Sequence, residues 1–90
     1  MRIFDTGNAD YAMAYAEEAA MVDASELIAS ALERSAMTKS GLARALNVSK
    51  SEITARLAGE RNITVRSLAK TLHVLGERLE LQSSPSSRHQ

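Results

Sequence analysis

The stretch from Lys39 to Asn62, KSGLARALNVSKSEITARLAGERN, constrains the fold of this chain more than any other. It predicts two short helices joined by a tight turn, with Thr38 and Ser49 placed to cap their N-termini. Asn47 occupies the turn, and after glycine it is among the residues that adopt a positive φ most easily. Gly59 suits the left-handed terminus of the second helix. Each helix therefore has its own start and its own stop in the sequence.

The apolar residues of this stretch fall on the faces where the two helices would meet. They are Leu42, Ala43 and Leu46 on the first helix, and Ile53 and Leu57 on the second. Ala43 has to be small because the second helix crosses close to it. Two helices in this arrangement form a helix-turn-helix, whose second helix enters the major groove of DNA.

The spacing of the motif carries a resemblance to a known family. Counted from Lys39 as its first position, Ala43, Asn47 and Gly59 fall where the Cro/cI-like (Xre) family expects a small residue, a turn residue and a glycine. Asn47 departs from the usual Gly, and Arg56 stands at an often apolar position. The resemblance implies an all-α, lambda-repressor-like bundle of about five helices with a short C-terminal strand used in dimerisation.

The chain divides into four parts on this reading. Residues 1–22 form an N-terminal arm and amphipathic helix, and residues 23–76 form the Xre-type DNA-binding domain. Residues 77–82 form the dimerisation strand, and residues 83–90 form a Ser-rich disordered tail. Asp23 and Glu26 have the form of a capping box, which predicts a helix that starts at Asp23 and is either continuous with the preceding helix or kinked there.

Both ends of the chain leave alternatives open. Arg2–Phe4 is either an edge strand or disordered. Tyr11 and Tyr15 lie on a helix that either packs on its own domain or forms a surface for a second copy or a protein partner. Leu79 and Leu81 alternate with polar residues, as in a half-buried strand, and a strand needs a partner. That partner is either Arg2–Phe4 or the same strand of a second subunit, paired antiparallel across a two-fold axis.

The net charge of zero hides an asymmetry along the chain. Residues 1–37 carry two basic and seven acidic side chains, whereas residues 38–70 carry seven basic and two acidic ones. The basic third coincides with the helix-turn-helix, and such asymmetry is typical of nucleic-acid binding. The acidic third would be repelled by DNA and is free for dimerisation or for a basic partner.

The site residues are those that the resemblance implies. The second helix of the motif would read base edges with residues on its N-terminal half and groove face, namely Lys50, Ser51, Thr54 and Ala55. Glu52 is expected to be occupied in capping. The phosphate backbone would be held by polar and basic side chains around that helix, namely Lys39, Arg44, Arg61, Asn62 and Thr64.

Catalytic and metal chemistry find no support in the sequence. The chain has no Cys, and His73 lies alone on a helix. Glu17 and Glu18 are adjacent acids without a His or a Gly-rich loop beside them. We therefore expect neither an enzyme nor a metal or other cofactor. No apolar stretch approaches the length of a membrane span and no signal sequence precedes the domain, so a cytoplasmic location is expected.

These observations favour a sequence-specific transcriptional repressor that binds double-stranded DNA at an inverted-repeat operator as a homodimer. The run from Gly59 to Gly76 resembles antitoxins of the HigA/HipB type. It favours the autoregulating antitoxin of a type II toxin–antitoxin pair, with a protein toxin as a possible partner. One alternative is a free-standing Xre or phage-type regulator without a toxin. Another is a protein-interaction module that no longer binds DNA.

Overall fold

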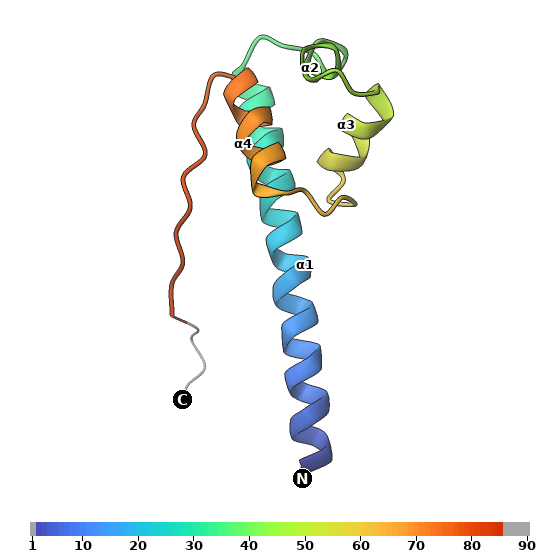
Figure 1. The fold of residues 1–90 in the computed structure, drawn as a ribbon, viewed down its shortest axis with the longest axis vertical. Helices are drawn as coiled ribbons and strands as arrows, with labels where there is room; N and C mark the ends of the chain where they lie inside the picture. Colours follow the sequence, from blue (N-terminus) through green and yellow to red (C-terminus); the bar gives the residue numbers. More distant parts are fainter. Residues whose placement is uncertain (1, 86–90) are drawn as a thin grey trace.

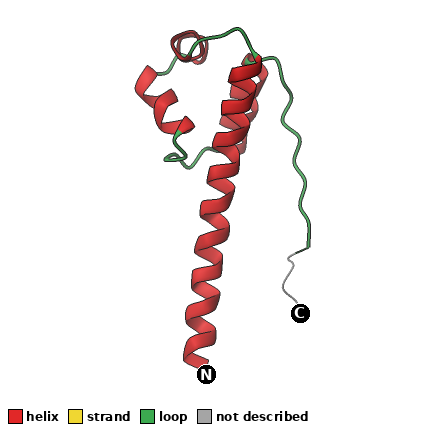
Figure 2. Ribbon diagram, turned by 180° about the vertical axis from the view of Figure 1, so that it is seen from behind, coloured by secondary structure: helices red, strands yellow, loops and turns green. Residues whose placement is uncertain are grey.

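The structure is a computed structural model that describes residues 2–85, with side chains from residue 9 onward. Within those residues it contains helices and no strand (Figures 1 and 2). One long helix carries a head made of its own C-terminal third and three short helices. The four helices are α1 (Arg2–Arg34), α2 (Lys39–Leu46), α3 (Lys50–Leu57) and α4 (Val65–Val74).

Helix α1 is a single helix of 33 residues, so the prediction of about five helices is wrong by one. The Ala-rich sequence favours helix on both sides of Asp23, and a new start there gains nothing. The Ser25 hydroxyl instead donates a hydrogen bond of 2.8 Å to the carbonyl of Val22 within the same helix. The backbone of Arg2–Phe4 is helical too, which excludes the edge strand that the sequence left open as one alternative.

The hydrophobic core lies entirely within the head. Ile28 and Ala31 of α1 are fully buried, as are Leu42 of α2 and Ile53 of α3. Such burial contributes about 1.5–3 kcal/mol for each large aliphatic side chain. The apolar face of α4 completes the cluster with Leu68, Leu72 and, at its end, Leu75. From residue 9 to residue 18, by contrast, every side chain of α1 is exposed. That part of the helix projects from the head, and we call it the stalk (Figure 1).

The three short helices end at residues with left-handed backbone, and the sequence predicted the first two of these ends. Asn47 has φ 60° and ψ 45°, and Gly59 and Gly76 have φ 76° and 86°. After each of these residues an amide bonds back to the last turn, from Val48 to Ala43, from Glu60 to Ala55 and from Glu77 to Leu72. These hydrogen bonds satisfy carbonyl groups that would otherwise lack a partner at the end of a helix. They also fix the direction in which the chain leaves each helix.

The segment after Gly76 is extended but pairs with no strand within residues 2–85, so the lone chain does not bear out the predicted C-terminal strand. Arg34 at the end of α1 forms a two-bond ion pair with Glu77, at 2.7 and 2.8 Å. Leu79 packs against the core, whereas Leu81 is 70% exposed. The physical reason is simple: a strand needs a neighbouring edge, and helical Arg2–Phe4 offers none.

Candidate nucleic-acid interface

Helix α3 presents the exposed surface expected of a recognition helix. The Ser49 hydroxyl accepts a hydrogen bond of 3.0 Å from the amide of Glu52 and so caps the helix. Ile53 is 0% exposed and anchors the opposite face in the core. Three of the predicted base-reading side chains, those of Lys50, Ser51 and Thr54, are exposed on the outer face of this helix.

Ala55, the fourth predicted base-reading residue, is placed differently. Its residue surface is only 8% exposed. It is one of the buried apolar residues of the head. A methyl group with so little accessible surface has almost nothing to offer a thymine methyl, so we leave Ala55 out of the base-reading set.

Arg56 is a structural residue that ties α3 to α4. Its side chain is only 13% exposed, and it donates a hydrogen bond of 3.1 Å to the Thr71 hydroxyl. Thr71 is fully buried in α4 and donates in turn to the carbonyl of Ser67, at 2.8 Å. The guanidinium thus occupies a half-buried place where the family often has an apolar residue. The outcome is that a polar contact joins α3 to α4, whereas both helices pack on α1 and α2.

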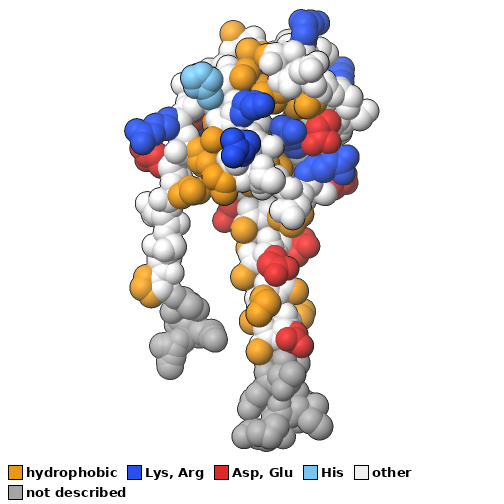
Figure 3. Space-filling model, viewed as in Figure 1, with side chains coloured by type: hydrophobic (Ala, Val, Ile, Leu, Met, Phe, Trp, Pro, Cys, Tyr) orange, Lys and Arg blue, Asp and Glu red, His pale blue; other side chains and the backbone are white. Residues whose placement is uncertain are grey.

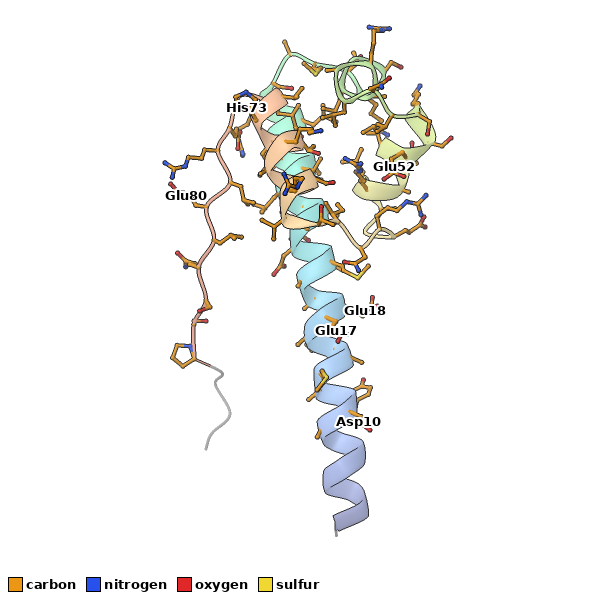
Figure 4. The ribbon with its side chains drawn as sticks, in the orientation of Figure 1. Asp10, Glu17, Glu18, Glu52, His73 and Glu80 are labelled. Carbon is orange, nitrogen blue, oxygen red and sulfur yellow. The ribbon has the colours of Figure 1, made fainter. Side chains whose placement is uncertain are left out.

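Glu52 accepts hydrogen bonds from two arginines at once. Arg56 donates to one carboxylate oxygen at 2.8 Å, and Arg61 donates to the other at 2.9 Å (Figure 4 labels Glu52). The bonds from Arg56 and then Arg61 hold the pKa of Glu52 below its ordinary value. The prediction that its side chain caps the helix is therefore wrong, because two cations within reach bind a carboxylate better than one backbone amide does.

The predicted phosphate-binding residues are all exposed, but they do not form one cluster. Arg44 lies in the last turn of α2, and Lys39 at its start lines a shallow groove with Leu57 and the end of α1. Asn62 faces α1 in a groove shared with Ile63. Thr64 is engaged as the cap of α4, where it accepts a hydrogen bond of 3.0 Å from the amide of Ser67. Arg61 alone is joined to the recognition helix, through Glu52.

Charge separates along the molecule as the sequence predicted. Figure 3 shows Lys and Arg side chains on the head, with some Asp and Glu side chains among them, whereas the charged side chains coloured along the stalk are all acidic. The labelled acids Asp10, Glu17 and Glu18 lie on α1 away from α2 and α3 (Figure 4). Because the basic side chains are on the head and the stalk carries only acidic ones within the described residues, the molecule is suited to approach a polyanion with the head foremost.

Metal binding and membrane insertion gain no structural support. Within the part of the chain that the structure describes, no group of three or more His, Cys, Asp or Glu side chains could hold a metal ion. His73 is exposed on α4, beside Glu77 and Arg78. No helix in the described range is both long enough and apolar enough to cross a membrane.

Sequence reasoning missed three contacts at this site. The i,i+4 spacing of Glu52 and Arg56 is a signal that could have revealed their pairing. The bond from Arg56 to Thr71 joins residues 15 positions apart on two helices, and no local pattern indicates it. Arg61 was found, but its attachment to Glu52 depends on the path of the loop between α3 and α4.

Comparison with known proteins gives one result that bears on this site. A family model described as helix-turn-helix matches residues 28–82, more than half of the chain. The match covers the buried end of α1, the three short helices and the extended segment, and it leaves out the stalk. No curated protein and no solved structure matches the chain.

Proposed function

The chain belongs to the Xre/cI-like helix-turn-helix family of DNA-binding transcription regulators, and from that premise we propose that it is a sequence-specific repressor. The observation that carries the proposal is the outer face of α3. Lys50, Ser51 and Thr54 stand exposed there on a helix that Ile53 anchors from behind. Lys50 can donate to guanine O6 or N7, and both hydroxyls can donate or accept at base edges.

The backbone of the DNA would be held by exposed side chains around α3. Lys39 lies at the N-terminus of α2, where the helix dipole adds positive potential, and Arg44 lies in its last turn. Asn62 and Thr64 follow on the loop and cap between α3 and α4, and Arg61 on the same loop adds a phosphate contact only where the Glu52 carboxylate releases it. Contacts of this kind position the protein and carry no sequence information.

A single head offers few base contacts, and a dimer on an inverted repeat doubles them. We place the two-fold axis at residues 77–82. Leu81 is 70% exposed and the backbone of this segment lacks a strand partner within the described residues. The same segment of a second copy, running antiparallel, would satisfy the backbone and cover Leu81.

Within the repressors, we propose the autoregulating antitoxin of a type II toxin–antitoxin pair rather than a free-standing regulator. The run from Gly59 to Gly76 supports this choice by its resemblance to antitoxins, and the acidic stalk supplies a surface that DNA binding does not use. Such a protein works where the genome is, which would place it in the cytoplasm. The identity of the adjacent gene decides between the two possibilities.

A gel shift with the promoter of the chain's own gene tests the proposal. We expect binding to that duplex to be about 10³-fold or more tighter than to random DNA of equal length at physiological salt. Equal affinity for both duplexes would refute a sequence-specific repressor. No binding to either would instead leave a protein-interaction module that no longer binds DNA.

A further inference from the structure

We propose that one face of α1, on the stalk and the helical turn that follows it, binds a basic protein through Tyr11, Tyr15 and Val22, with the carboxylate of Glu18 at the centre of the contact. Because the proposed antitoxin role supplies the partner, this inference rests on the proposed function. To the proposed function it adds the binding surface, the chemistry of the partner and the residue that selects that partner.

The continuity of α1 puts these residues on one face. Tyr11, Tyr15, Glu18 and Val22 follow one another at intervals of four, three and four residues, the spacing of the contact face of a helix. All four side chains are exposed, with Tyr11 at 76% and Tyr15 at 68%. A break at Asp23, which the sequence also allowed, would have separated this face from the head.

The exposed apolar area calls for a partner. The ring of a tyrosine carries a large apolar surface, and tyrosine is enriched where proteins meet. A helix with all its side chains in water gains no stability from burial, and an isolated stretch this short is marginal. Since the stalk contributes nothing to the core, its two tyrosines are explained by binding better than by folding.

The charge of α1 determines what kind of partner fits. Between residues 9 and 33 the sequence has six acidic side chains and no basic one. Glu18 lies between Tyr15 and Val22 in the apolar stripe itself, and Glu26 continues the stripe toward the head. A partner that covers this face must bring Lys or Arg to Glu18, because a buried carboxylate without a counter-charge is costly.

The same geometry disfavours a second copy of this chain. In a symmetric pair of stalks, Glu18 would occupy a core position, and residues 9–33 of either copy bring no Lys or Arg to neutralise it. The pair would then bury like charges. Tyrosine faces also attract cations, so a basic surface gains from both kinds of residue in the stripe.

Isothermal titration tests this inference with the purified product of the gene adjacent to this chain's own. We expect the full-length chain to bind it and Glu18→Lys to weaken binding by at least about 30-fold, because a charge pair at the centre of an interface becomes a repulsion. Glu17→Lys makes the same charge change about 100° around the helix, on the side turned to Asn62 and Ile63. This control should lose less than about fivefold.

Two results would overturn the inference. One is that the neighbouring protein fails to bind, or binds Glu18→Lys and Glu17→Lys equally well. The other is that the wild-type chain forms a dimer that Tyr15→Ser weakens in sedimentation, which would put a second copy on this face. The promoter gel shift, run on the same variants, reports the repressor function separately. Normal DNA binding without partner binding would refute only the proposal for the stalk.

Discussion

Replacement of Glu52 by Gln tests how the head meets DNA. In the free protein the Glu52 carboxylate holds Arg61 at 2.9 Å and Arg56 at 2.8 Å. Gln keeps the size of the side chain but removes its charge, so the hold on Arg61 weakens most, because that side chain is 51% exposed and Arg56 only 13%. We expect Arg61 to become available to a phosphate.

The size of the effect follows from counterion release. One additional phosphate contact should steepen the slope of log K against log salt concentration by about 0.9. At an ionic strength of about 0.15 M this corresponds to roughly fivefold tighter binding, for specific and random duplexes alike. The ratio between the two affinities should stay the same, because phosphate contacts carry no sequence information.

Fluorescence anisotropy with operator and random duplexes, titrated over a range of salt concentrations, measures the salt slope and the ratio of the two affinities. Glu60→Gln is the matched control: it removes the same charge from an exposed side chain next to Arg61 and leaves the Glu52 ion pairs in place. Combining Glu52→Gln with Arg61→Ala should cancel the extra slope. An unchanged slope, or weaker binding to the operator alone, would show that Glu52 orients α3 through Arg56 rather than withholding Arg61.

Four further outcomes are expected. Lys50→Ala should weaken binding to the cognate operator by roughly 1–3 kcal/mol and random DNA much less, as anisotropy would show; equal losses would exclude base reading by this residue. Leu81→Asp should convert a dimer to a folded monomer in sedimentation, and an unchanged dimer would place the interface elsewhere. Deletion of residues 1–20 should leave the circular dichroism of the head intact, because the core begins beyond them; an unfolded product would contradict this. Glu52 and Glu77 both have a folded pKa below the ordinary 4.5. The stability that their ionised carboxylates contribute is therefore complete above that value and is lost as the pH falls through the lowered pKa values. The unfolding temperature should fall below about pH 5 and stay level above it.

The parts of the fold that local chemistry determines were predictable from the sequence. Asn47, Gly59 and Gly76 have the left-handed backbone that their types favour, and Ser49 and Thr64 cap the helices that follow them. Each of these features depends on a few consecutive residues. The helix-turn-helix and its exposed outer face could be predicted for the same reason.

The features that could not be predicted depended on competition between two local structures or on contacts between residues far apart in the sequence. At Asp23 the capping box competed with uninterrupted helix, and the alanines on both sides decided for helix. Glu52 had an amide and two guanidinium groups within reach, and only the folded positions of Arg56 and Arg61 show which it binds. The strand predicted around Leu81 requires a second chain, which one sequence read alone cannot supply.

The exposure of the stalk has a consequence for how this protein can evolve. From residue 9 to residue 18 no side chain is buried, so substitutions there leave the packing of the head unchanged. Residues such as Ile28 and Ile53 have no such freedom, because each fills space that several neighbours share. Selection on the stalk therefore concerns only helix formation and whatever binds it. A new partner could be acquired by changing a few surface positions while the operator stays the same.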